Sequence, residues 1–261
     1  KSLMLVLKVA YLIGVIGVKP ESILVITYTK NAAQELKDRL RQYVSHSNVS
    51  ASTIHSFCYK ILSANGGERY KNLSKRIKND SFRIKLLKRV LKKLGLTDMY
   101  KPQDLLIQIS KAKSTMKRDF EGDYGRIFSL YEEMMHKKEG MDFEDLINHT
   151  IELLLSNAPL LEGLKSTYKH IFFDEIQDTS PLEYRLVQLI SQPSGSLCVL
   201  GDMMQSIFSF RGGDISIIRD FAKHHPDTRE YFLASNHRST SGIVKLCNSF
   251  TDRTSIAIRD N

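Results

Sequence analysis

Two adjacent carboxylates, Asp174 and Glu175, follow the apolar run Ile171–Phe173. A strand ending in two acids presents them at the carboxyl edge of a sheet, where open α/β sheets bind ligands. In a nucleotide-hydrolysing enzyme the first acid can hold Mg²⁺, and the second can orient and deprotonate the attacking water. The alternative is an acidic strand-to-helix turn without a ligand. The octet Ile171–Asp178 therefore favours, without proving, a nucleotide site.

Three weaker signals point to the same chemistry. Gln205 follows Leu200-Gly201-Asp202, and its amide could bond a terminal phosphate. The guanidinium of Arg238, next to His237, could neutralise phosphate charge. Lys1 and Ser2 match only the last two positions of the phosphate-binding pattern GxxxxGK[ST], and the glycines of that pattern are not present. Each signal is weak by itself, since such residues are common on protein surfaces.

Four aromatic residues stand beside polar or basic neighbours: Tyr28, Phe57, Phe208 and Phe210. Aromatic rings in such positions can stack on the bases of a single-stranded nucleic acid. An aromatic ring at a strand end is more commonly part of the hydrophobic core. The sequence leaves both interpretations open for each ring.

Strand and helix patterns alternate around these residues. We expect strands at 22–29, 170–175, 196–202 and 229–235, each apolar or rich in β-branched side chains. Helices are expected after the N-cap residues Thr29 and Ser180 and over 241–250. This alternation predicts an α/β fold, a parallel sheet with helices on both faces.

The middle of the chain has helical rather than strand patterns. Between residues 60 and 118 there are 17 Lys and Arg against 4 Asp and Glu, whereas the whole chain carries a net charge of +9. A solvated helix face explains many basic runs, but an excess of this size indicates a polyanion such as nucleic acid. We predict an α/β domain over 1–57 and 158–261, interrupted by a basic helical domain over 58–157.

The composition excludes several classes of protein. The chain has 261 residues, 42% of them hydrophobic, which is enough for a sizeable core. Three well-separated cysteines indicate neither a disulfide framework nor a zinc site, and they fit a reducing cytoplasm. The apolar first 18 residues resemble a signal peptide, but Lys8 interrupts them. We expect a buried helix there, and no membrane association.

The order of the segments resembles the first half of a UvrD/Rep-type superfamily 1 DNA helicase. Six segments carry the resemblance, in the family's order: ITYTKNAAQELKDRL, STIHSFCYKIL, MDFEDLI, FFDEIQDTS, VLGDMMQSIFSFRGG and LASNHRSTSGIV. They span nearly the whole chain. The resemblance implies a RecA-like P-loop NTPase domain, called 1A, with an inserted helical domain, called 1B. It also implies that a second RecA-like domain belongs to the parent protein.

The resemblance implies a role for each matching residue. Lys1 would bind phosphate, Ser2 and Asp174 would hold Mg²⁺, and Glu175 would be the catalytic base. Gln205 and Arg238 would contact the γ-phosphate of ATP, and His237 stands where a tyrosine usually stacks on adenine. The residues in motifs that line the single strand are Tyr28, His55, Phe57, Phe208, Phe210 and Arg211.

The expected function is therefore that of the N-terminal motor part of a helicase, with ATP and Mg²⁺ as cofactors. Single-stranded DNA and duplex junctions are the expected partners, and DNA repair is one expected process. Departures from the family pattern include His237, and Phe210 in place of a usual tryptophan. Two alternatives remain open. One is part of a RecB-type helicase–nuclease subunit, and the other is a DNA-binding module without ATPase activity.

Overall fold

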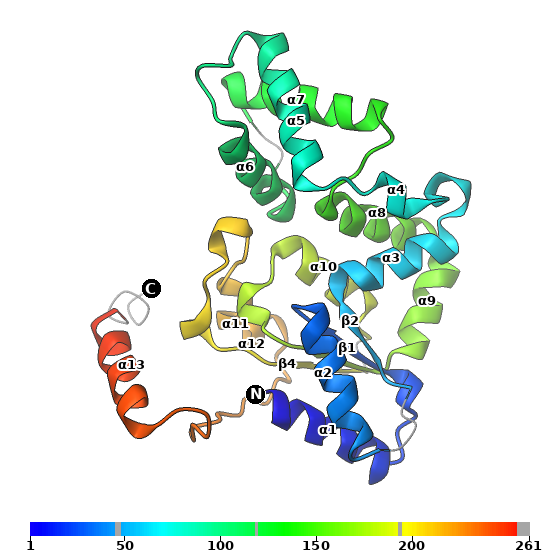
Figure 1. The fold of residues 1–261 in the computed structure, drawn as a ribbon. Coiled ribbons are helices and arrows are strands. Elements are labelled where there is room, and N and C mark those ends of the chain that lie inside the picture. The colour runs from blue at the N-terminus through cyan, green and yellow to red at the C-terminus, as the bar shows by residue number, and fades with distance from the viewer. Residues whose placement is uncertain (45–47, 118–119, 193–194, 255–261) are drawn as a thin grey trace.

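The sheet is parallel and has four strands in the order β2-β1-β3-β4. A computed structural model describes residues 1–261 except 45–47, 118–119, 193–194 and 255–261. The strands are β1 Ile23–Thr27, β2 Ser50–Thr53, β3 His170–Phe173 and β4 Ser196–Val199. The predicted α/β class is confirmed, and Figure 1 shows helices on both sides of the sheet.

The central strand β1 is buried on both faces. Its apolar residues alternate between two core clusters: Ile23 and Val25 face one, and Leu24 and Ile26 face the other. A continuous apolar run is what a strand in the middle of a parallel sheet requires, because helices cover both faces. With this pairing, Ile26 of β1 lies beside Phe173 of β3, so both strands end at the same edge of the sheet.

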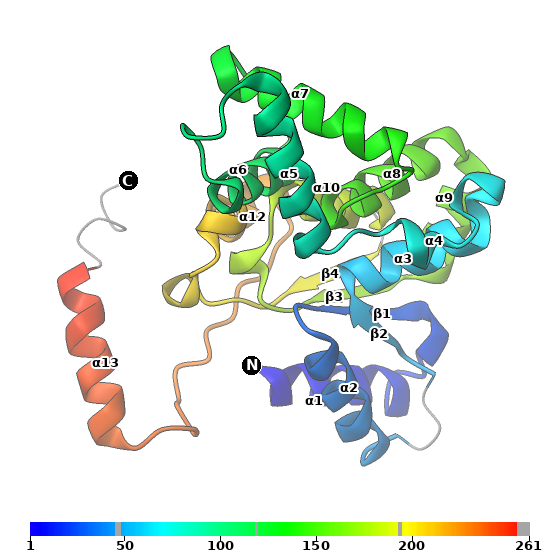
Figure 2. The same cartoon turned by 45° about the horizontal axis from the view of Figure 1, so that its top comes forward.

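Two helices cover the first face and a larger group covers the second (Figure 2). Helices α1 and α2 pack with the cluster that contains Ile23 and Val25. Helices α3, α8 and α10 pack with the cluster that contains Leu24 and Ile26. The helices of this chain are α1 Ser2–Gly14, α2 Lys30–Arg41, α3 Ile54–Asn65, α4 Leu73–Arg76, α5 Asp80–Leu94, α6 Pro102–Ser114, α7 Gly122–Lys137, α8 Phe143–Ser156, α9 Ala158–Thr167, α10 Pro181–Ile190, α11 Ser216–Arg219, α12 Phe221–His224 and α13 Ser241–Thr254.

A third core cluster lies between α5, α6 and α7, above the sheet in Figure 1. Leu86, Leu87, Val90 and Leu91 of α5 are all buried there, as the helical spacing of that segment predicts. Helices α3 and α8 contribute instead to the cluster on the sheet. The domain boundaries at 57/58 and 157/158 stay predictions.

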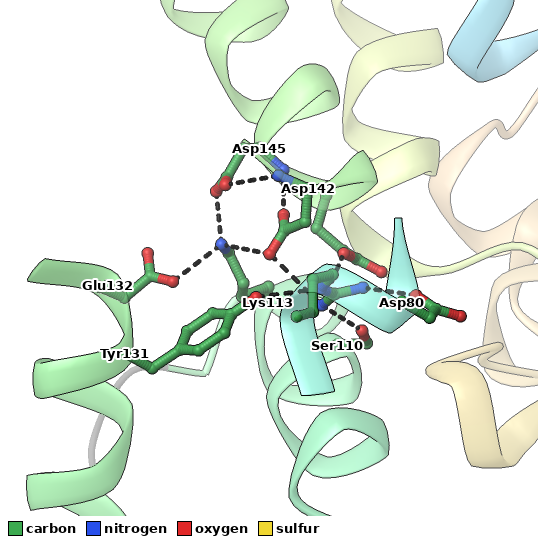
Figure 3. A network of polar contacts seen from close by, with 9 residues as sticks. Asp80, Ser110, Lys113, Tyr131, Glu132, Asp142 and Asp145 are labelled. Carbon is green, nitrogen blue, oxygen red and sulfur yellow. Dashed lines mark hydrogen bonds and ion pairs between the residues drawn. The ribbon is translucent and has the colours of Figure 1, made fainter. Parts of the chain in front are cut away.

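A buried polar network joins these helices to α8 (Figure 3). The Lys113 ammonium on α6 lies 2.9 Å from Asp142 Oδ2 and 2.5 Å from Asp145 Oδ1. Arg83 on α5 lies 3.4 Å from Asp142 Oδ2 and donates to the Tyr131 hydroxyl of α7 at 2.9 Å. Asp142 also caps α8 in a capping box with Asp145. The network thus ties α5, α6 and α7 to the N-terminus of α8.

Strands are present within the predicted ranges 22–29, 170–175 and 196–202, each two or three residues shorter than predicted, but the strand predicted at 229–235 is wrong. Residues 229–235 are exposed and form no strand, because no neighbouring strand pairs with them in the described residues. The structure instead contains β2, which the sequence analysis did not predict. Its four residues Ser50–Thr53 are short and mostly polar, so they lack the apolar pattern of a buried strand.

Local capping signals are confirmed. The Thr29 hydroxyl accepts a hydrogen bond from the Ala32 amide at 3.1 Å and starts α2. Ser180 and Glu183 form a capping box at α10. The expected helix at the amino terminus is also present, but only one side of α1 is buried, through Leu5, Val6 and Val9. None of the helices among the described residues has the length and apolar character needed to cross a membrane.

Candidate functional site

The two carboxylates predicted to do chemistry lie directly after β3. The Asp174 amide donates to the Ile26 carbonyl of β1 at 2.9 Å, which extends the sheet pairing by one residue. Glu175 then adopts a left-handed conformation with φ 56° and ψ 44°. Few residues other than glycine adopt that conformation, and it ends the strand abruptly. The turn leaves Asp174 buried and Glu175 partly exposed at the edge of the sheet.

Lys1, 174 residues earlier in the sequence, meets this turn. Its Nζ lies 2.6 Å from Glu175 Oε2 and donates to Gln205 Oε1 at 3.5 Å. Gln205 ends the short 3-10 turn Met203–Gln205 that follows β4. Its amide also donates to Asp202 at 2.6 Å. The structure therefore brings together Lys1, Glu175 and Gln205, which lie on three separate segments.

The two carboxyl groups have opposite pKa shifts. Burial raises the pKa of Asp174, and repulsion from Glu175 raises it further. Burial also opposes ionisation of Glu175, but hydrogen bonds from Lys1 and Gln177 outweigh it and lower the pKa of that carboxyl. Glu175 is consequently ionised near neutral pH and able to accept a proton.

Gln177 connects this turn to the next loop, and sequence reasoning did not single it out. Its Nε2 donates to Glu175 Oε2 at 2.8 Å, and its Oε1 accepts from the Asp202 amide at 3.0 Å. The side chain is almost completely buried, with 1% exposure. The position of Gln177, two residues after Glu175, could be read from the sequence. Its contact with Asp202, 25 residues away, could not.

Aromatic rings continue the same edge. The Tyr28 and Phe208 centroids are 5.0 Å apart, and those of Phe208 and Phe210 are 6.0 Å apart. The Arg211 guanidinium lies 5.6 Å from the centroids of both phenylalanines. Tyr28 and Phe210 are 39% and 49% exposed, so the group has ring surface open to a ligand. Exposed aromatic rings next to a cation are suited to unpaired bases.

A profile of the UvrD/REP helicase N-terminal domain matches residues 1–226. The chain belongs to the UvrD/REP helicase family. It is 32% identical to the ATP-dependent DNA helicase PcrA of Leuconostoc citreum over 95% of this chain and 35% of that protein. PcrA of Staphylococcus aureus (strain Mu50) is also 32% identical, over 95% of this chain and 36% of its own length.

The protein YjcD of Bacillus subtilis (strain 168) is 30% identical over 94% of this chain and 34% of its own length. The chain thus spans about a third of the length of the curated relatives it matches. Membership of the UvrD/REP family agrees with the order of the six segments recognised in the sequence.

Two further residues predicted to line the single strand, His55 and Phe57, lie in other environments. His55 is partly buried and meets Phe143 edge to face, with centroids 5.2 Å apart. Burial lowers its pKa, so the ring is neutral near pH 7. Phe57 is only 4% exposed, and its ring centroid lies 6.0 Å from that of Tyr168. The Phe57 ring belongs to the core, and we do not include it among the stacking residues.

His237 and Arg238 are not brought to the edge of the sheet. Both are exposed in an extended segment before α13, which stands apart from the body of the molecule in Figures 1 and 2. The Asn236 side chain accepts from the amides of Arg238 and Ser239, at 2.9 and 3.0 Å. A strand at 229–235 would have brought His237 and Arg238 to the edge of the sheet. Because that segment forms no strand, the two residues lie away from the edge. Their nucleotide-binding roles remain predictions.

The groups at the edge fit a nucleoside triphosphate with Mg²⁺. Mg²⁺ is usually held by one or two protein oxygens together with phosphates and water. Asp174 offers a carboxylate, and Ser2 is exposed at the start of α1. Among the residues that the structure describes, no cluster of three or more His, Cys, Asp or Glu side chains could hold a metal alone. This donor set is the kind that completes its coordination with a phosphate ligand.

Proposed function

We propose that this chain is the N-terminal motor part of an ATP-dependent DNA helicase. In that role it couples ATP hydrolysis to movement along single-stranded DNA and to duplex unwinding. The proposal rests on one observation: the residues predicted to bind the nucleotide and the aromatic rings predicted to bind DNA lie next to one another along one edge of the sheet. Lys1, Glu175 and Gln205 meet there, and the turn that holds Gln205 leads directly into Phe208 and Phe210. Two of the relatives are named ATP-dependent DNA helicases.

The nucleotide would lie against the ends of β1 and β3. Lys1 would leave its ion pair with Glu175 and neutralise phosphate charge, while Ser2 and Asp174 would hold Mg²⁺. Bound Mg²⁺ would supply further neutralisation of the phosphate oxygens. Glu175 would orient the attacking water and accept its proton. Gln205 would hydrogen-bond the terminal phosphate.

Roles for Arg238 at that phosphate and for His237 at the base are carried only by the family resemblance. In the structure both lie on the exposed segment before α13. We propose that they act when that segment lies against the edge. The reducing cytoplasm, and DNA repair as the process, stay predictions in the same way.

The single strand would stack on Tyr28, Phe208 and Phe210, with Arg211 contributing positive charge. The exposed basic residues between 60 and 117, on α3 to α6 and in the loops between them, would contact phosphates of the strand or of a duplex junction. Arg83 and Lys113 are instead held in the buried network of Figure 3. We propose that α5, α6 and α7 are the centre of the inserted helical domain, because they share a core of their own.

Replacing Glu175 by Gln in the full-length protein tests the function. The amide keeps the shape of the side chain but cannot accept the proton, so ATP turnover should fall ~10²- to 10⁴-fold while ATP binding is retained. Asp174→Asn should instead weaken Mg²⁺-dependent nucleotide binding. Glu162→Gln on α9 removes an exposed carboxylate and serves as the control. Parental turnover by the Glu175→Gln protein would show that the base is a different residue.

A further inference from the structure

Gln177 has every polar atom of its side chain engaged. The carbonyl oxygen Oε1 accepts from the backbone amide of Asp202, a group that can only donate. This contact determines which way the amide points, so the Nε2 group must face the Glu175 carboxylate at 2.8 Å. Nε2 also lies 3.4 Å from Asp178 Oδ2. A buried amide held at both ends has little freedom to turn.

The partner oxygen, Glu175 Oε2, is shared. It receives one hydrogen bond from Gln177 and another from Lys1 Nζ at 2.6 Å. In the proposed function Lys1 turns to a phosphate when nucleotide binds. The Gln177 amide is then the neighbour that still donates to Oε2 and sets the direction of the carboxylate.

The residues around Gln177 also hold the loop after β4 at both ends. The start of the loop is held through the Asp202 amide. Its end is held by two hydrogen bonds. The Ser206 hydroxyl donates to the backbone carbonyl of Gln177 at 3.2 Å, and the Ile207 amide donates to Asp178 Oδ1 at 3.3 Å. Phe208 of the aromatic group follows immediately. One residue therefore touches both the carboxylate and the base-stacking loop.

Gly201 gives independent support for this close approach. A Cβ atom at position 201 would lie 2.6 Å from an Ile218 methyl group, 2.8 Å from Gln177 Oε1 and 2.9 Å from an Ile176 methyl group. A larger residue would require Ile218, Gln177 and Ile176 to shift. The Gln177 side chain is thus one of three that pack directly against this glycine.

We propose that Gln177 is a positioning residue that aims the Glu175 carboxylate and couples it to the DNA-stacking loop at 202–208. The inference rests on the proposed function. It assigns to Gln177 no contact with ATP or DNA. Loss of its amide should therefore impair turnover and communication between the two ligands, while leaving the binding of each ligand alone nearly unchanged.

The split between kcat and the KM for ATP offers a readout that a purely structural role would not change. Gln177 hydrogen-bonds the Glu175 carboxylate, so loss of its amide should lower kcat and leave the KM for ATP nearly unchanged.

Two substitutions in the full-length protein separate the two ends of the amide. Gln177→Met removes both contacts at similar volume, and Gln177→Glu keeps an acceptor for Asp202 but places a carboxylate against Glu175. Gln188→Met, at an exposed position of α10, is the matched control. We expect kcat to fall ~10- to 100-fold in both Gln177 variants, the range for losing a hydrogen bond to a charged group. The KM for ATP should stay within about twofold, since Gln177 adds no binding to the nucleotide itself.

Fluorescence anisotropy of labelled single-stranded DNA, with and without a non-hydrolysable ATP analogue, gives a readout independent of turnover. The analogue should change the DNA affinity of the parental and Gln188→Met proteins but not that of Gln177→Met.

Failure of the inference and failure of the proposed function differ in outcome. A parental protein that hydrolyses no ATP contradicts the function itself. An active parental protein whose two Gln177 variants keep its kcat and its nucleotide-dependent DNA affinity overturns the inference alone. If Gln177→Met does not fold, the kcat of Gln177→Glu decides between these outcomes. Gln177→Glu keeps the acceptor for the Asp202 amide, so it retains the contact with the loop after β4.

Discussion

Replacing Lys113 by Met should destabilise the protein through the buried network of Figure 3. The Lys113 side chain is 10% exposed, and its partner Asp142 is fully buried. The substitution removes the cation paired with Asp145 and one of the two cations paired with Asp142. Removing one partner of a buried ion pair in this way costs about 3–5 kcal/mol. Urea unfolding of the 261-residue chain followed by circular dichroism measures this loss. Lys111→Met, at an exposed position of the same helix, should stay within about 0.5 kcal/mol of the parental value.

The loss should depend on pH. Burial, followed by repulsion from Asp142, raises the pKa of Asp145 to about 7. Near pH 6 Asp145 is largely neutral, whereas near pH 8 it is ionised and needs Lys113 as its counter-charge. Lys113→Met should therefore cost more stability at about pH 8 than at about pH 6.

Ionisation of Asp145 and Asp142 should also change the stability of the parental protein with pH. The folded state holds the Asp145 proton more tightly than the unfolded chain, so this group's contribution to stability falls as pH rises from about 4 to about 7. Asp142 behaves oppositely: burial opposes its ionisation, but Lys113 and Arg83 hold its pKa at about 2. Its contribution is present above about pH 4 and is lost below that value.

A double substitution provides the decisive comparison. Asp145→Asn in the Lys113→Met background removes a charge of each sign and should recover part of the lost stability at about pH 8. A Lys113→Met protein that loses less than about 1 kcal/mol, or loses the same amount at both pH values, would refute the reasoning.

Two further predictions concern the aromatic residues. Phe210→Ala should weaken binding of single-stranded DNA by ~1–3 kcal/mol, the range for stacking on a base. The melting temperature should stay parental because the ring is half-exposed. The slope of log affinity against log salt should also stay parental because the ring carries no charge. Phe57→Ala should instead lower the free energy of unfolding by ~3–5 kcal/mol, as truncation of a buried ring does. Anisotropy titrations beside thermal melts distinguish them, and an unchanged DNA affinity for Phe210→Ala would exclude its stacking role.

Short-range signals determined much of the fold from the sequence. The apolar runs of β1 and β3 identify buried strands, since each must be covered on both faces. The Thr29 cap and the Ser180–Glu183 capping box act over three residues, so their spacing is readable directly. The order of the segments was equally readable and indicated the family that the profile shows.

Long-range contacts decided the rest. Gln177 meets an amide 25 residues away, and Lys1 meets a carboxylate 174 residues away. No local pattern encodes such pairs, because they exist only after the strands align their carboxyl ends. The burial of Phe57 was likewise open in the sequence, since the same aromatic residue suits a core or a base-stacking surface.

The strands that the sequence analysis misjudged have the same explanation. Residues 229–235 have an apolar strand pattern, yet no neighbouring strand pairs with them in the described residues. The polar segment Ser50–Thr53 has little strand pattern, yet it pairs with β1 at the edge of the sheet. Strand stability comes from hydrogen bonds and packing against a neighbour, so tertiary structure decides which segments with marginal patterns become strands.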